Sequence, residues 1–94
     1  VGITSFDQQG ISLSQNIPNP ATDNTVIRYS VPSDGSVTFN VYSISGQVLY
    51  SQTAETSFGA HSIELNTSDL SAGIYFYSME FKGQRLIKRM VIER

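Results

Sequence analysis

The sequence predicts an all-β domain folded as an antiparallel β-sandwich of about seven strands. Short stretches alternate apolar and polar residues, which is the period of a half-buried strand. Turn-forming residues separate these stretches at spacings of about 8 to 14 residues, as in small sandwiches. The 3.6-residue periodicity of a long amphipathic helix is missing. A chain of 94 residues has room for one domain with one hydrophobic core.

The first residues are predicted to be extended and peripheral. Ile3 to Phe6 forms a short leading strand, and Ile11 and Leu13 begin a second extended piece. We therefore assign residues 1–12 to a linker or leading strand and residues 13–94 to the sandwich. Because the chain begins with Val rather than Met, we expect it to be a piece of a larger protein or a processed product.

A segment with two prolines comes before the first long strand. Pro18 and Pro20 fix their own φ angles and lack an N–H, so the stretch Asn16-Ile17-Pro18-Asn19-Pro20 is neither a helix nor a central strand. The strand that follows has one predominantly apolar face, formed by Thr25, Ile27, Tyr29 and Val31.

Two turns shape the middle of the chain. Pro32-Ser33-Asp34-Gly35 is predicted as a turn in which proline sets φ, aspartate caps its own backbone and glycine supplies a positive φ. Ser45-Gly46 closes a hairpin whose strands carry their alternating apolar residues at Val37, Phe39 and Val41, then at Val48 and Tyr50. After the loop at Ser57-Phe58-Gly59, another strand alternates at His61, Ile63 and Leu65.

The carboxyl-terminal part forms the last two strands, Gly73 to Phe81 and Arg85 to Ile92, joined by the short turn Lys82-Gly83-Gln84. The stretch from Asp69 to Tyr75 resembles the corner before the sixth strand of immunoglobulin-like domains, where a tyrosine hydroxyl bonds to backbone a few residues upstream. Tyr75 is predicted to be that tyrosine, and Gly73 the position of close approach. We therefore expect an immunoglobulin-like sandwich, and one without a disulfide because the chain has no cysteine.

The composition argues against several classes of function. The absence of cysteine removes thiolate metal sites and thiol nucleophiles. The single histidine, His61, lies on the apolar side of its strand and is predicted to be a partly buried structural residue. We predict no enzyme activity, no cofactor and no metal site. The apolar runs are far shorter than the roughly 20 residues of a spanning helix, so we expect no direct membrane insertion.

Charge is strongly segregated along the chain. Residues 1–81 hold one base and seven acids, a balance of −6, whereas residues 82–94 hold five bases and one acid, a balance of +4. The overall pI of about 5.1 argues against a nucleic-acid partner. Bases on an edge strand often serve only to block aggregation. A protein receptor that reads the terminal strand is the functional alternative, because a strand edge offers backbone pairing and the bases offer steering.

Five segments in order resemble one family, the type A C-terminal sorting domain of the Bacteroidota type IX secretion system. The resemblance covers the chain from Leu13 to Arg94. Its motifs are Gln15-Asn16-Ile17-Pro18-Asn19-Pro20, the strand from Thr25 to Pro32, the hairpin from Val41 to Val48, Leu70-Ser71-Ala72-Gly73-Ile74-Tyr75, and Lys88-Arg89-Met90-Val91-Ile92.

The resemblance implies a transport role. Such a domain is covalently linked to an N-terminal cargo, passes through the periplasm, and directs the cargo across the outer membrane to the cell surface or the medium. Its partners are the type IX secretion machinery, including an outer-membrane shuttle and a sortase-like peptidase that commonly cleaves before the domain. The residues expected to be recognised are Lys88, Arg89, Met90, Val91, Ile92 and Arg94. Those expected to shape the domain are Pro18, Asn19, Pro20, Gly46, Gly73 and Tyr75.

Two other possibilities stay open at this point. The chain is alternatively an adhesive or carbohydrate-binding β-sandwich appended to an extracellular enzyme, for which exposed tyrosines on one face would be needed. Tyr75 and Tyr77 are expected in a central strand and so in the core. The terminal strand also offers a route to a homodimer by edge pairing.

Overall fold

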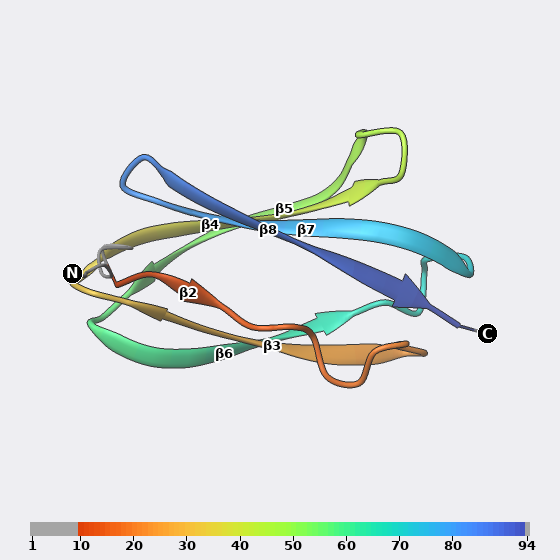
Figure 1. Cartoon of the computed structure of the whole chain (residues 1–94), viewed down its shortest axis with the longest axis horizontal. Helices are drawn as coiled ribbons and strands as arrows, with labels where there is room; N and C mark the ends of the chain where they lie inside the picture. Colours follow the sequence, from red (N-terminus) through yellow and green to blue (C-terminus); the bar gives the residue numbers. More distant parts are fainter. Residues whose placement is uncertain (1–9, 94) are drawn as a thin grey trace, which may run out of the picture.

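The structure, a computed structural model, describes residues 10–93. Within this range the chain forms seven strands in two antiparallel sheets that face each other (Figure 1). The strands are β2 (Ser12–Leu13), β3 (Asn24–Val31), β4 (Gly35–Ser43), β5 (Val48–Thr56), β6 (Gly59–Asn66), β7 (Gly73–Phe81) and β8 (Gln84–Ile92). The prediction of an all-β, immunoglobulin-like sandwich is confirmed. Residues 10–93 contain no helix long and apolar enough to cross a membrane.

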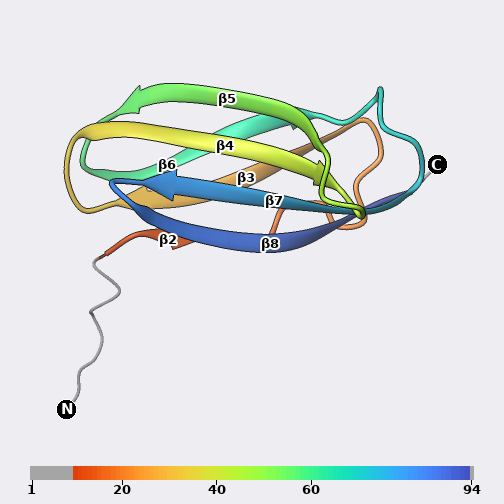
Figure 2. The same cartoon turned by 90° about the horizontal axis from the view of Figure 1, so that it is seen from above.

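The two sheets differ in size. The smaller one has the strand order β2-β3-β6, and the larger one has the order β5-β4-β7-β8 (Figure 2). β7 is therefore a central strand, as expected for Tyr75 and Tyr77, and β8 is an edge strand. The predicted leading strand from Ile3 to Phe6 lies outside the described residues.

The core lies between the inner faces of the two sheets. It contains the apolar alternating residues predicted for β3 and β4, together with Tyr75 and Tyr77 of β7, because one side of each strand faces the opposite sheet. Its members are Ile11, Leu13, Ala21, Ile27, Tyr29, Val31, Val37, Phe39, Val41, Leu65, Tyr75, Tyr77, Met79, Phe81, Met90 and Ile92.

The folded body extends to the N-terminal side of the predicted boundary at residue 13. Ile11 is buried in the core, and Ser12 pairs with Ser30 of β3. Periodicity could not place this boundary, because a strand of two residues contains too few alternations to show a period.

β5 is longer than its apolar alternation indicated. The expected return strand of the hairpin stops near Ser51, but pairing with β4 continues to Thr56. The added residues are polar except Ala54. On the outer side of the sheet, cross-strand contacts such as that between the Thr38 and Thr53 hydroxyls, 3.0 Å apart, take the place of apolar alternation.

The turn before β4 works differently from the prediction. The Asp34 carboxylate accepts a hydrogen bond from the Phe58 N–H at 2.8 Å, so it ties two loops together rather than capping its own backbone. Gly35 does not adopt a positive φ. A Cβ at this position would lie 3.0 Å from Cε1 of Phe81, so close packing is what requires glycine here.

His61 lies half-buried at the rim of the core. Its ring stacks on Tyr29 with a centroid distance of 5.6 Å, and its Nε2 lies 2.7 Å from the Ser57 carbonyl oxygen. Both contacts serve packing, which agrees with the structural role predicted for this histidine.

Candidate functional site

The terminal strand lies at the edge of the larger sheet, and β7 is the one strand within residues 10–93 that pairs with it. Its register sets Met90 opposite Tyr75, and this register turns Met90 and Ile92 into the core, where both are almost fully buried. Lys88 and Arg89 are exposed, and Val91 is half-buried. Of the six residues expected to be recognised, Arg94 lies outside the described residues. Met90 and Ile92 offer no side-chain surface to a partner of the folded domain.

A segment from the other end of the chain lies along the outer edge of β8. We call this segment, residues 15–21, the proline strap. Its last residue, Ala21, donates its N–H to the Val91 carbonyl at 2.8 Å and accepts the N–H of Glu93 at 2.8 Å. These bonds form a parallel bridge between Ala21 and Ile92, which explains why Ala21 is fully buried.

Two amide side chains of the proline strap complete the contact. Asn19 Oδ1 accepts the Val91 N–H at 3.0 Å, and Gln15 Nε2 donates to the Arg89 carbonyl at 2.7 Å. Pro18 and Pro20 lie on either side of Asn19 and are exposed. The edge from residue 89 to residue 93 is therefore largely covered by the chain itself. The backbone pairing expected of the strand edge is therefore taken up, in this part of β8, by the proline strap.

Asn16 holds the proline strap in shape from inside. Its side chain is buried, donates from Nδ2 to the Pro18 carbonyl at 3.0 Å and to Thr25 Oγ1 at 3.2 Å, and accepts from Gln15 Nε2 at 2.7 Å. Sequence reasoning did not single out Gln15 and Asn16 as site residues. The signal available for them was two amides directly before a proline segment, where polar side chains often satisfy backbone groups.

The amino-terminal half of the β8 edge is different. Outward-facing backbone groups recur at every second residue, so Arg85 and Ile87 point the same way as Val91. Among residues 10–93, no strand pairs with this part of the edge. This part of β8 therefore forms its backbone hydrogen bonds within residues 10–93 with β7 alone.

Two structural residues stabilise the approach to β7. The Tyr75 hydroxyl donates to the Ser71 carbonyl at 2.7 Å, the bond that a tyrosine corner requires. Gly73 adopts a φ of 154°, and the nearest atom to a Cβ there would be 4.0 Å away. The backbone conformation, and not close approach, therefore favours glycine at Gly73. Gly46 likewise has a positive φ, 95°, in the turn that joins β4 to β5.

Buried Tyr77 connects the core to the segment before the proline strap. Its hydroxyl donates to the Ser14 carbonyl at 2.6 Å. Burial raises the pKa of Tyr77 to about 12, and a backbone hydrogen bond with Asn16 opposes the shift. The raised pKa means that ionising this hydroxyl disfavours the folded state.

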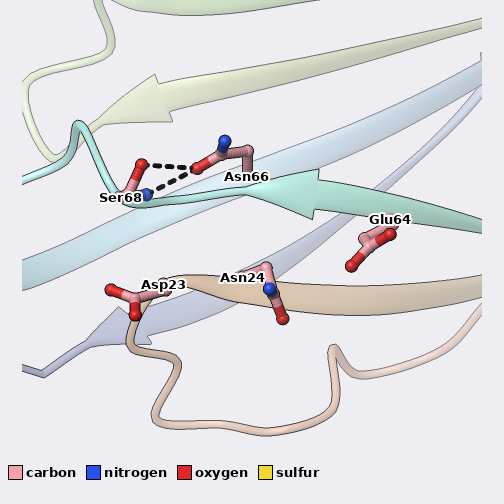
Figure 3. Close-up of a pocket in the computed structure, with 5 residues that line it drawn as sticks. All are labelled: Asp23, Asn24, Glu64, Asn66 and Ser68. Atoms are coloured by element: carbon pink, nitrogen blue, oxygen red, sulfur yellow. Dashed lines mark hydrogen bonds between the residues drawn. The ribbon is translucent and has the colours of Figure 1, made fainter.

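A polar depression lies at one end of the smaller sheet. It is lined by Asp23, Asn24, Glu64, Asn66 and Ser68 (Figure 3). Asn66 Oδ1 is occupied by the N–H and hydroxyl of Ser68, at 2.9 and 2.7 Å. In the part of the chain that the structure describes, no three His, Cys, Asp or Glu side chains are grouped so that they could hold a metal ion.

These features define a β-sandwich module that displays a cationic edge strand, held from outside by its own N-terminal segment. A protein-family model described as the secretion system C-terminal sorting domain matches residues 16–93, and the chain belongs to this family. It is thus a C-terminal sorting signal of the type IX secretion system, a class of sorting tags for proteins exported to the cell surface or secreted. The secretion machinery is its partner. The curated proteins contain no match to the chain.

Proposed function

We propose that an outer-membrane shuttle of the secretion machinery reads this domain in its folded form, through the exposed cations of β8. The observation that carries the proposal is the exposure of Lys88 and Arg89 on a strand whose next inward residues, Met90 and Ile92, are buried. Neighbouring residues of a strand point to opposite faces, so the two cations offer contacts on both sides of the edge. Half-buried Val91 extends the same surface, and Arg94, outside the described residues, stays in the proposed recognition set.

The proline strap supports this reading because it fixes the strand that carries the cations. Its contacts with Arg89, Val91 and Glu93 hold the backbone directly beside and beyond the cationic pair. A partner then binds a preorganised surface and orders less of the chain on binding, which favours affinity. Charge supports it as well, because a strip of +4 on a body of −6 orients the domain toward an acidic receptor.

The domain is in this proposal a substrate of transport and carries out no reaction. Its cargo precedes it in the chain, passes through the periplasm with it, and is released when a sortase-like peptidase cleaves between cargo and sandwich. Since Ile11 and Leu13 are buried in the core, the scissile bond is expected to lie before Ile11. Residues 1–12 remain the proposed linker, although its last two residues, Ile11 and Ser12, pack against or pair with the sandwich. Residues 13–94 are the proposed sorting domain.

The test is delivery of a reporter fused to residues 1–94 in a type IX-competent cell. Deleting residues 88–94 is a poor test, because it also removes Met90 and Ile92 from the core. The double charge reversal Lys88→Glu and Arg89→Glu changes only exposed side chains. We expect it to reduce surface delivery at least about tenfold, as the loss of paired interface charges commonly does.

The matched control is Arg28→Glu, which also reverses a positive charge but at an exposed position of β3, in the other sheet. It is expected to keep delivery near the wild-type level. Circular dichroism of the purified domains checks that each variant is folded. Normal delivery of the folded double reversal, or an equal defect in Arg28→Glu, would contradict recognition through β8.

The proline strap also limits which residues of β8 could pair with a second copy of the chain in a homodimer. The proline strap occupies the edge beyond Arg89, so two copies would pair over the stretch around Arg85 and Ile87. This is shorter than a typical strand of about five or six residues. Sedimentation at rising concentration tests the pairing, and a monomer throughout would remove it from the proposal.

The adhesive or carbohydrate-binding alternative finds little support in the placement of the aromatics. Tyr29, Tyr75 and Tyr77 are buried in the core. Tyr42 is half-buried on the outer side of β4, and Tyr50, on β5, is 42% exposed. The five tyrosines thus do not form one exposed platform for sugar stacking.

A further inference from the structure

The outer face of the larger sheet is divided into two unlike halves. One half is polar and internally paired, with the Thr38 and Thr53 hydroxyls 3.0 Å apart and Ser36 donating to Glu55 at 2.5 Å. Such a half needs no partner, because antiparallel sheets commonly expose one face to water. The other half carries the apolar outer patch, which consists of Tyr42, Ile44, Val48, Ile74, Phe76 and Ile87.

Strand register gathers the apolar outer patch from distant parts of the sequence. Tyr42 pairs with Val48 on one side and with Phe76 on the other, and Phe76 pairs with Arg89. This row crosses all four strands. Ile44 is 69% exposed, Val48 53% and Ile87 50%, which is unusual for large aliphatic side chains grouped on one face.

A groove runs through the apolar outer patch between the β4–β5 turn and β8. It is lined by Ile44 and Gly46 from the turn, Tyr42 and Phe76 from the floor, and Arg85 and Ile87 from β8. The two aromatic rings and two isoleucines provide an apolar anchor pocket, the usual centre of a protein interface.

The two arginines beside the groove have different roles. Arg85 is engaged within the domain, since it donates to the Tyr42 hydroxyl at 2.8 Å and lies 3.6 Å from the Glu80 carboxylate. The hydrogen bond between the Ser78 and Tyr42 hydroxyls, together with Arg85, lowers the pKa of Tyr42. The guanidinium of Arg89 is exposed, and no carboxylate within residues 10–93 forms an ion pair with it. The patch thus ends in a cation available to a partner.

We propose that the apolar outer patch docks an extended acidic–apolar segment of a protein partner. An aliphatic or aromatic side chain of the segment fills the groove over Tyr42, Phe76 and Ile87, and a neighbouring carboxylate pairs with Arg89. This proposal rests on the proposed function for the partner's identity as a component of the secretion machinery. A second copy fits less well, because face-to-face packing of this surface would bring cations against cations.

The probe is a short capped peptide, acetyl-Glu-Phe-Glu-Leu-Glu-amide, titrated into the ¹⁵N-labelled 94-residue chain. Its basic counterpart, in which each Glu is Lys, tests the role of charge. We expect chemical-shift changes from the acidic peptide to concentrate at residues 42–48, 74–76 and 85–89. The basic peptide is expected to bind at least about tenfold more weakly, the effect of losing roughly 1.4 kcal/mol.

Ile87→Thr and Ile44→Thr test the groove. Each is expected to weaken binding of the acidic peptide several-fold, whereas Phe58→Thr, which removes a 70% exposed aromatic from the loop after β5, is expected to leave it unchanged. The amide spectrum of each variant shows whether it is folded, and Ile44, in an exposed turn, provides the second variant should Ile87→Thr unfold.

Equal binding of both peptides, shifts spread evenly over the surface, or concentration-dependent self-association in place of peptide binding would each overturn the proposal. The two proposals fail separately. If the acidic peptide does not bind but the charge reversal at Lys88 and Arg89 still blocks delivery, the docking patch is wrong and the sorting mechanism stands. If the peptide binds but delivery is unaffected, the sorting mechanism through β8 is wrong instead.

Discussion

The Val91 N–H donates a hydrogen bond to Asn19 Oδ1 at 3.0 Å, across 72 positions of sequence. This bond connects the proline segment near the beginning of the domain to the last strand. The two motifs are therefore parts of one structure, in which the first holds the outer edge of the second.

Asn19→Ala is expected to expose the Val91 amide without unfolding the domain. The amide loses its acceptor, so its hydrogen exchange should accelerate at least about tenfold, while amides in β7 keep their rates. Asn19→Asp keeps an acceptor oxygen and should restore most of the protection. Exchange measured by NMR compares the variants, and an unchanged Val91 rate in Asn19→Ala would show that the bond contributes nothing to the edge.

Tyr75→Phe removes the hydroxyl that bonds to the Ser71 carbonyl while keeping the buried ring. We expect a loss of about 1 kcal/mol in the free energy of unfolding, the typical net value of such a bond. For a domain of this size that loss lowers Tm by about 4 to 8 °C. Tyr50→Phe, at an exposed position of β5, is the control and should change Tm little. Equal effects of the two substitutions would rule out a clamp at Tyr75.

Gly35→Ala is expected to destabilise the domain by about 1 to 3 kcal/mol, the usual cost of overpacking a core. The added Cβ would lie 3.0 Å from the Phe81 ring, which is buried and has little room to move. Phe81→Leu shortens the obstructing side chain. In a double-mutant cycle measured by denaturant unfolding, the pair should be less destabilised than the sum of the single variants. Simple additivity would mean that the contact with Phe81 is not the cause.

The raised pKa of Tyr77 predicts a loss of stability in alkaline solution. The folded value is about 12 against an ordinary value of 10.0, so the folded state retains the phenolic proton where the unfolded chain has released it. The contribution of Tyr77 to stability is therefore complete below pH 10 and is lost as the pH rises through 12. By pH 12 the loss approaches about 2 kcal/mol.

Tyr77→Phe isolates this effect. The variant should be less stable at pH 8, since the bond to the Ser14 carbonyl is gone, but its stability should fall less between pH 10 and 12. Urea unfolding of both chains at each pH gives the comparison. Parallel curves for the two chains would mean that Tyr77 titrates alike in the folded and unfolded states.

The local sequence pattern was enough to predict the position of strands that stand out by their apolar residues. Thr25 to Val31 shows clear alternation, whereas Gly73 to Phe81 opens with a continuous apolar run, and both form strands close to the predicted bounds. It was insufficient for the second half of β5, where residues such as Gln52 and Glu55 carry no apolar signal and are held by pairing with β4. The turn at Asp34 and Gly35 was predicted with the wrong mechanism, because its partners, Phe58 and Phe81, are remote in sequence.

The sequence by itself determined the sandwich, the tyrosine corner, the separation of charge and the family, because each of these depends on residues close together in the chain or on motifs in a fixed order. Only the tertiary structure decided which residues of the last strand are available. Both sides of that strand read apolar, basic, apolar, and the register with Tyr75 is what buries Met90 while Arg89 stays outside. The tertiary structure likewise decided that the proline strap covers the Val91 backbone. It also brought the residues of the apolar outer patch together. Edge contacts and cross-strand rows join residues that lie tens of positions apart, and a pattern of neighbours along the chain does not contain that information.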